Sequence, residues 1–178
     1  MRVNVKLADL LAGFELEVRE EHVPDQFRAV VQRGWIEEDG AQLLASLYSN
    51  YSGPAQSGFE DVVQYEATVN GRGMMDYDLP SSGPERSRTL LNRAFSYACT
   101  ALVAVPVGWP VPILGCVSLS EGGLDDDLLT AHVTFCSRRP GLPLFVQEIE
   151  SYKHEALMEI SQDDATGMLG RTSLSNGC

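Results

Sequence analysis

A long stretch without charge interrupts this otherwise acidic chain. Residues 94–120 contain no Asp, Glu, Lys or Arg, and residues 101–119 read ALVAVPVGWPVPILGCVSL. A membrane-spanning helix needs about 20 predominantly apolar residues, with basic residues flanking it. Here three prolines fall between residues 106 and 112, and each removes a backbone donor and disfavours helix in the residue before it. The sequence EGGLDDD that follows is acidic, so we expect this stretch to form core and not a membrane span.

The uncharged stretch begins inside the strongest helical pattern of the chain. Leu91, Phe95, Ala98 and Leu102 recur at spacings of four, three and four residues, which predicts an amphipathic helix over residues 84–104. The sequence VPVGWPVP then predicts a proline-fixed corner, and ILGCVSL predicts a strand. Apolar residues occupy both faces of that strand, so we expect it to lie centrally in a sheet that is covered on both sides.

The first third of the chain predicts a strand and two helices. Alternation in FELEV predicts a half-buried strand over residues 14–18. Residues 23–34 predict a helix, because Pro24 suits a first turn and Gly34 suits an end. Asp39 is placed to cap a second helix over residues 39–51, whose apolar stripe consists of Leu43, Leu44, Leu47, Tyr48 and Tyr51.

Residues 61–79 predict a β-hairpin. Val63, Tyr65, Ala67 and Val69 alternate with polar residues, and so do Met75, Tyr77 and Leu79. If opposed residues share a face, Val69 lies opposite Met75, and residues 71–73 form the tip of the hairpin. Asp76 and Asp78 would then lie on its exposed face.

Two segments after the central strand predict helices. Residues 124–138 fit a strand and a helix equally well by periodicity. Acidic residues open this segment and two arginines close it before Pro-Gly, an order that complements a helix dipole and favours the helix. Residues 143–160 predict another helix, and the polar residues 162–178 predict a flexible tail.

Together these elements predict a single α+β domain over residues 1–161, in which residues 1–38 could form an N-terminal extension. An antiparallel sheet packs against the long central helix and the C-terminal helices. The hydrophobic content of 44% suits a globular protein.

The net charge limits the classes of partner that we expect, and the cysteine content indicates the compartment. The chain has 25 acidic and 13 Lys and Arg residues, a net charge of -12, which disfavours nucleic acid and favours basic proteins as partners. Its four cysteines include no C-x-x-C pair, so neither a disulfide framework nor a zinc ribbon is predicted. The N-terminal sequence predicts no secretion signal, and we expect a reducing cytoplasm as the compartment.

The candidate chemical groups are few. His132 and Cys136 would share a face of a helix, where they could act as base and nucleophile or as half of a metal site with the nearby Asp125–Asp127. A histidine and a cysteine with ordinary structural roles explain the same pair. Phosphate-loop, nucleophile-elbow and zinc-protease motifs are absent from the sequence, and no cofactor or metal is predicted.

Trp109 is the residue most suggestive of binding. A tryptophan between prolines on a connecting loop either plugs the core or anchors a partner protein, and a rigid loop loses little entropy on binding. We therefore predict an apolar partner-binding anchor of Val107, Trp109 and Val111, with Asp76 and Asp78 supplying charge complementarity.

The predicted order of elements resembles the type III secretion chaperone fold over about residues 39–160. The resemblance depends on the hairpin, the helix RTLLNRAFSYACTAL, the following strand, and a G-L-D-x-x-x-L turn in SLSEGGLDDDLLTAHVTFC. It implies a homodimer without catalytic activity, whose hydrophobic patches bind an extended segment of a secreted protein. The chain departs from the family in its first 38 residues, in having two strands where the family has three before the helix, and in its two closing helices.

Three hypotheses of function follow. The first is an acidic, non-enzymatic protein-binding module of the secretion-chaperone kind. The second is an immunity or antitoxin-type inhibitor, whose acidic face neutralises a basic toxin. The third is a small enzyme that uses His132 and Cys136.

Overall fold

The computed structural model describes the chain except for residues 76, 81–82, 122–128 and 176–178. It confirms an α+β fold built on a main antiparallel sheet and a small second sheet. The main sheet has the order β1-β7-β5-β6-β4, with strands β1 (Arg2–Val3), β4 (Arg72–Met75), β5 (Ile113–Glu121), β6 (Leu129–Ser137) and β7 (Ala156–Ser161). The second sheet pairs β2 (Trp35–Glu38) with β3 (Ala41–Leu44).

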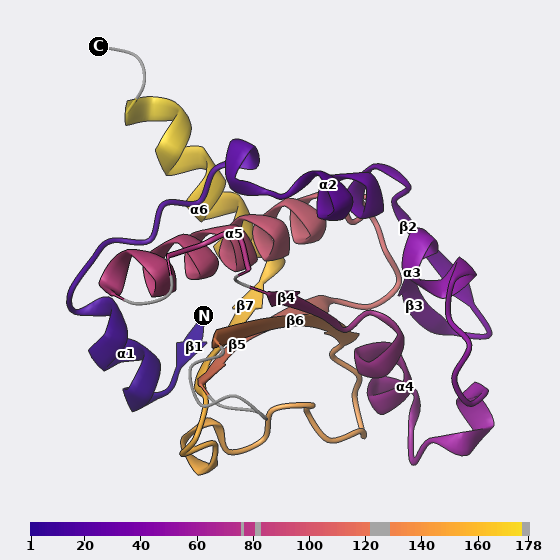
Figure 1. Cartoon of the computed structure of the whole chain (residues 1–178). Coiled ribbons are helices and arrows are strands. Elements are labelled where there is room, and N and C mark those ends of the chain that lie inside the picture. The colour runs from indigo at the N-terminus through magenta and orange to yellow at the C-terminus, as the bar shows by residue number, and fades with distance from the viewer. Residues whose placement is uncertain (76, 81–82, 122–128, 176–178) are drawn as a thin grey trace.

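The helices of the described residues surround the main sheet (Figure 1). They are α1 (Val5–Leu11), α2 (Asp25–Gln32), α3 (Ala45–Ser49), α4 (Val62–Val69), α5 (Pro84–Val103) and α6 (Gln162–Ser175). Short 3₁₀ turns occur at Glu20–His22, Gln56–Gly58 and Ile149–Ser151.

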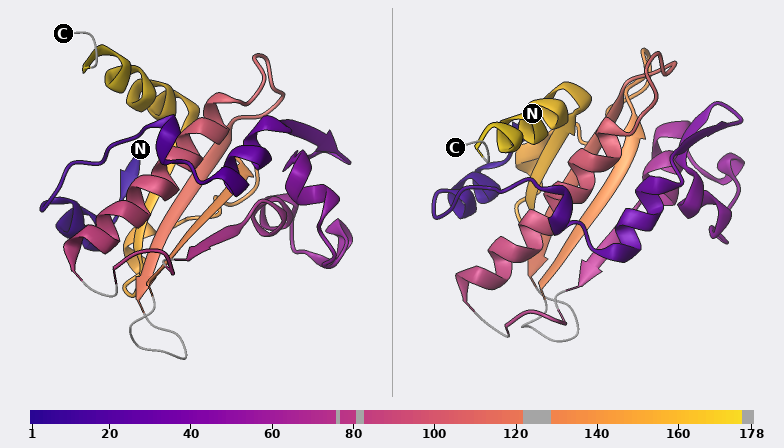
Figure 2. Two further views of the ribbon diagram at one scale, coloured as in Figure 1. Left: turned by 45° about the horizontal axis from the view of Figure 1, so that its top comes forward. Right: turned by 90° about the horizontal axis from the view of Figure 1, so that it is seen from above.

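The long helix α5 lies across one face of the main sheet, as the sequence predicts (Figures 1 and 2). Pro84 occupies its first turn, where a missing N–H costs nothing. Its apolar stripe packs with the inward side chains of β5 and β6 in the main core, where Phe95, Val117 and Phe135 have no solvent exposure. The central place of β5 between β6 and β7 is also confirmed.

The small sheet and α4 correct two predictions. Residues 39–51 do not form one helix: Asp39 and Gly40 have positive φ, 48° and 78°, and make the two-residue turn between β2 and β3. The segment predicted as the first hairpin strand is the helix α4, capped by Asp61, which accepts a hydrogen bond from the Gln64 N–H at 2.9 Å. The predicted pairing of Val69 with Met75 is therefore wrong.

The period-two pattern of α4 has a packing cause. Tyr65 and Val69 belong to the apolar cluster under the small sheet, whereas Val63 and Ala67 pack with Cys136 of the main sheet. A helix buried on two sides shows apolar residues at every second position, and this pattern imitates a strand.

Residues 14–18 contain no regular strand, which corrects a third prediction. The chain instead runs beside α5 and bonds to its side chains. The Glu17 N–H donates to Asn92 Oδ1 and the Arg19 N–H donates to Ser96 Oγ, both at 3.0 Å. The alternation reflects packing against a helix, with Val18 in the main core.

The two predicted C-terminal helices are wrong. Residues 129–137 form β6, where Ala131, Val133 and Phe135 face α5; residues 122–128, which include the acidic run, lie outside the described residues. Residues 143–160 comprise an irregular connection with a 3₁₀ turn, followed by β7. The first prediction relied on the order of charges at the ends of the segment. The β-branched residues inside the segment favour a strand, and they were the better guide.

The C-terminal segment predicted as a flexible tail forms α6. Ser161 and Asp164 make a reciprocal cap: Asp164 Oδ2 accepts from the Ser161 N–H at 3.0 Å, and Ser161 Oγ accepts from the Asp164 N–H at 3.2 Å. At the other end of the chain, β1 joins the main sheet beside β7, and Leu7, Val23 and Phe27 belong to the main core.

Candidate functional site

His132 and Cys136 do not form a catalytic pair. Both lie on β6, four residues apart, so they share a face but are separated by about 13 Å along the strand. Cys136 is 1% exposed, and its hydrogen bond to Cys116 together with burial raises the pKa of its thiol. Burial of the imidazole lowers the pKa of His132. This arrangement provides neither an activated thiolate nor a base within reach of it.

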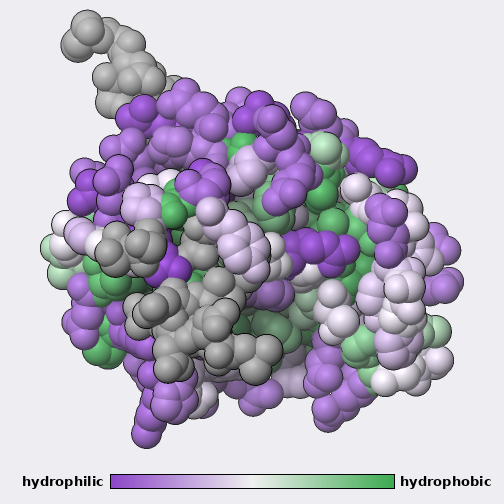
Figure 3. Space-filling view, in the orientation of Figure 1, coloured by the Kyte–Doolittle hydropathy of each residue, from purple (hydrophilic) through white to green (hydrophobic). Residues whose placement is uncertain are grey.

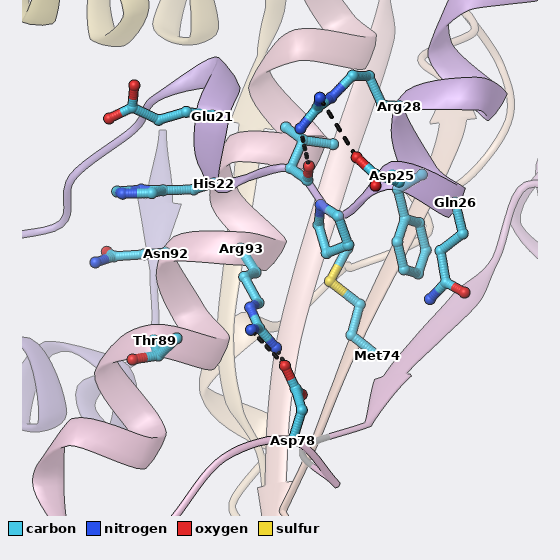
Figure 4. Close-up of a pocket in the computed structure, with 13 residues that line it drawn as sticks. Glu21, His22, Asp25, Gln26, Arg28, Met74, Asp78, Thr89, Asn92 and Arg93 are labelled. Atoms are coloured by element: carbon cyan, nitrogen blue, oxygen red, sulfur yellow. Dashed lines mark hydrogen bonds and ion pairs between the residues drawn. The ribbon is translucent and has the colours of Figure 1, made fainter.

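A cavity of about 640 Å³ lies between the segment 21–28, helix α5 and the end of β4 (Figure 4). Four of its charged side chains form two pairs within the cavity. Arg93 and Asp78 point toward each other and form two hydrogen bonds, of 2.9 and 2.6 Å. Arg28 lies 3.4 Å from Asp25. Because each of these four residues already has a partner of opposite charge, none of the four offers an unpaired charge to a ligand.

The Asp78–Arg93 pair accounts for one residue that the sequence singled out. Asp78 lies after β4 at the mouth of the cavity, where the hydrogen bond from Arg93 lowers the pKa of its carboxyl group. Its partner in the prediction, Asp76, lies outside the described residues. The structure therefore gives Asp78 an intramolecular partner.

The proline-fixed loop between α5 and β5 presents an apolar tip. The Trp109 N–H donates to the Pro106 carbonyl at 3.2 Å, and Gly108 adopts a φ of +80°, so residues 106–109 form a tight turn. Val107 occupies its tip, fully exposed. Trp109 is half-buried against the main core, and its indole N–H is buried with no hydrogen-bond partner among the described residues. Val111 is also half-buried.

The segment between Arg33 and Arg72 carries a concentration of negative charge that sequence reasoning missed. It contains six carboxylates and no Lys, Arg or His, which is half of the net charge of -12. The segment folds into β2, β3, α3 and α4, a unit that we call the acidic lobe and that forms one side of the molecule (Figure 1). The signal was visible in the sequence as a long gap between basic residues.

Five carboxylates of the acidic lobe lie at its surface and form no ion pair among the described residues. They are Glu37, Glu38, Asp39, Glu60 and Asp61. Asp39 and Asp61 line one hollow of about 500 Å³, together with Phe59. Burial raises the pKa of Tyr65 beneath them, and the neighbouring Asp39 and Glu38 add to this shift. In the space-filling view, hydrophilic residues cover most of the face shown, and hydrophobic residues appear mainly in its hollows (Figure 3).

The sixth carboxylate, Glu66, has no solvent exposure and fixes the lobe to the main sheet. It accepts hydrogen bonds from the Gln42 N–H at 2.8 Å and from the Ser137 N–H at 2.6 Å, and it pairs with Arg139 at 2.9 Å. One turn later, Asn70 accepts from the Leu44 N–H at 2.9 Å. The main-chain N–H groups on the edge of β3 that faces away from β2 are thus bound by side chains of α4 and of its C-terminal cap.

The acidic lobe and the apolar loop lie next to each other. The indole N–H of Trp35, at the start of β2, donates to the carbonyl of Ala101 near the end of α5, at 2.9 Å. The loop leaves α5 at this point, beside the small sheet (Figures 1 and 2). The start of the acidic lobe is therefore fixed to the end of α5 from which the apolar loop departs.

Within the described residues, no cluster of three or more His, Cys, Asp or Glu could hold a metal ion. In the same part of the chain, no helix combines the length and the apolar character needed to cross a membrane. Comparison of the chain with protein-family models, with curated proteins and with solved structures gives no match.

Proposed function

We propose that this chain is a non-enzymatic protein-binding module, and that the acidic lobe recognises a basic partner protein. The observation that carries the proposal is the set of five carboxylates, four exposed and one half-buried, that form no ion pair among the described residues, on a lobe whose own segment contains no basic residue. Carboxylates whose charge is not compensated by an ion pair attract a positively charged surface over a distance of about one Debye length, about 8 Å at physiological ionic strength.

The neighbouring loop supports a protein partner in particular. A protein interface combines a buried apolar centre with a polar rim. Val107 supplies exposed apolar surface on the loop that follows the end of α5, where Trp35 of the lobe is bound, and the half-buried Trp109 holds the turn against the core. Because the turn is fixed by proline and by packing, little conformational entropy is lost when a partner covers it.

An immunity or antitoxin-type inhibitor is the specific form of this function that the acidic lobe favours. Such an inhibitor neutralises a basic toxin, so added salt should slow the association of the two proteins steeply. A cytoplasmic location is part of the proposal. The buried free thiols of Cys99, Cys116 and Cys136 suit a reducing compartment.

The secretion-chaperone hypothesis is the second candidate, and the full exposure of Val107 favours it. In that function, the apolar loop and a homodimer interface would hold an extended segment of a secreted protein. Binding would then depend weakly on salt and strongly on Val107.

Capture of partners from the native source at moderate salt, with identification by mass spectrometry, tests the proposal. We expect one stoichiometric partner with a basic surface, whose association rate falls steeply between low and physiological salt. A neutral or acidic secreted partner with salt-independent binding would support the chaperone instead. Recovery of the chain alone would contradict both.

A further inference from the structure

One edge of the strand β2 is paired with no other strand among the described residues. In a strand of an antiparallel pair, the main-chain N–H and C=O groups of alternate residues point to opposite edges, so the pairing with β3 shows which groups of β2 point to the other edge. Gln42 and Leu44 of β3 direct their N–H groups away from β2, toward Glu66 and Asn70. The partners of the alternate residues, Ala41 and Leu43, are Glu38 and Ile36. The main-chain groups of Glu37 and Trp35 therefore point outward.

Glu37 is the accessible point of this edge. Within the described part of the chain, its main-chain N–H and C=O have no hydrogen-bond partner, and the residue is exposed. Trp35 also directs its main chain outward, but it is only 7% exposed. Figure 2 shows β2 at the outer margin of the molecule, with the opposite edge of its sheet facing α4.

The charges beside this edge select its occupant. Glu37, Glu38 and Asp39 are consecutive, so carboxylates project from both faces of β2 and from the turn that follows. Pairing of the same edge in two copies of this chain would place these carboxylates against one another, which is unfavourable. An added strand with Lys or Arg on both of its faces would pair with them.

We propose that the free edge of β2 binds an extended segment of the partner, rich in Lys and Arg, as a third strand of the small sheet. The inference rests on the proposed function, because it names the part of a basic partner that the acidic lobe recognises. Main-chain hydrogen bonds with Glu37 give the segment its position, and the three carboxylates give it its charge preference. Glu66 and Asn70 hold the small sheet in place behind the binding edge.

A synthetic probe separates main-chain recognition from charge attraction. The probe is an acetylated decapeptide that repeats Lys-Lys-Thr, which places Lys on both faces of a strand, and its control is the same peptide with an N-methyl group on every internal amide, which blocks both edges. Both peptides have the same charge, but the control cannot form a strand ladder. We expect the control to bind the wild-type protein about tenfold more weakly, as the loss of two main-chain hydrogen bonds implies. Equal binding of the two peptides would overturn the inference and leave the acidic lobe as a site of charge attraction only.

Amide exchange gives a residue-specific readout. In the free protein, the Glu37 amide should exchange with solvent faster than the Ile36 and Glu38 amides, which face the ladder with β3. We expect saturation with the Lys–Thr peptide to slow exchange at Glu37 by about tenfold or more. Unchanged exchange at Glu37 in the saturated complex would place the peptide elsewhere and overturn the proposal.

Two substitutions at one position complete the test. Glu37→Pro removes the outward N–H without removing an internal ladder bond, and Glu37→Ala removes the carboxylate but keeps the N–H. We expect Glu37→Pro to bind the peptide more weakly than Glu37→Ala does, and equal affinities would count against the inference. If Glu37→Pro fails to fold, the N-methylated peptide still decides the question. The proposed function has a separate test: if neutralising the exposed carboxylates of the acidic lobe leaves the affinity for the partner unchanged, the proposed function itself is contradicted, whatever binds at this strand.

Discussion

The carboxylate of Glu66 and the guanidinium of Arg139 meet at 2.9 Å and join α4 to the end of β6. The Glu66 side chain has no solvent exposure, and that of Arg139 is 20% exposed. Two main-chain N–H groups from different sheets donate to the same carboxylate. This contact therefore determines where the acidic lobe sits relative to the main sheet.

Replacing Glu66 by Ala should be strongly destabilising. It leaves Arg139 without its partner and two buried N–H groups without acceptors, and breaking such a buried pair costs about 3–5 kcal/mol. The free energy of unfolding, from denaturant titration, measures the effect. Glu60→Ala is the matched control on the exposed surface, and its cost should stay within about 0.5 kcal/mol. Equal losses in the two variants would show that the buried network does not hold the lobe.

The apolar loop yields a pair of substitutions with different outcomes. Val107 is fully exposed, so Val107→Ser should change the free energy of unfolding by less than about 0.5 kcal/mol. If the loop is a hot spot, the same variant should bind the partner about 1–2 kcal/mol more weakly. Trp109 packs against the core, so Trp109→Ala should lower both stability and affinity. Calorimetric binding and chemical unfolding separate the two effects, and unchanged affinity of both variants would remove the loop from the interface.

The long helix, the loop after it and the central strand could be predicted because each obeys one local rule. The stripe through Leu91, Phe95 and Leu102 faces a single core, and the prolines permit neither helix nor ladder. The apolar residues on both faces of β5 reflect real cover on both faces. For these segments, local pattern and tertiary packing agree.

Other segments were misread because tertiary contacts set their pattern. Helix α4 packs on two sides and so imitates a strand. The Asp-Gly pair at residues 39–40 is a strong hairpin signal, but the apolar stripe after it suggested a helix with Asp39 as its cap. Of the predicted binding residues, Val107 is exposed, Trp109 is half-buried, and Asp78 is paired with Arg93. The acidic lobe could have been found from the absence of basic residues between Arg33 and Arg72.

The ion pair at the cavity mouth predicts a pH effect with a definite sign. The hydrogen bond from Arg93 lowers the pKa of Asp78 in the folded state. The stabilisation by this pair is therefore present above the ordinary carboxyl pKa and is lost as pH falls through the lowered value. Titration of the Asp78 carboxyl group by NMR should give a higher pKa in Arg93→Met than in the wild type. The same pKa in both proteins would show that the pair does not persist in solution.

The thiols should be inert in the folded protein. Burial raises the pKa of Cys99 to about 12, and Cys136 is buried with its pKa raised as well. At pH 8 iodoacetamide should therefore leave both residues unmodified in the native state and alkylate them after unfolding, as peptide mapping by mass spectrometry would show. Rapid native alkylation of Cys136 would revive the hypothesis of a cysteine-dependent enzyme.

The most direct test of the account is the affinity of the captured partner for two charge variants. In the lobe variant, Glu37, Glu38 and Glu60 become Gln and Asp39 becomes Asn. In the control variant, which loses the same number of exposed carboxylates elsewhere, Glu15, Glu85 and Glu148 become Gln and Asp9 becomes Asn. We expect the lobe variant to lose most of its affinity and its salt dependence, and the control variant to keep both. Equal affinity of the two variants for the partner would contradict recognition through the acidic lobe.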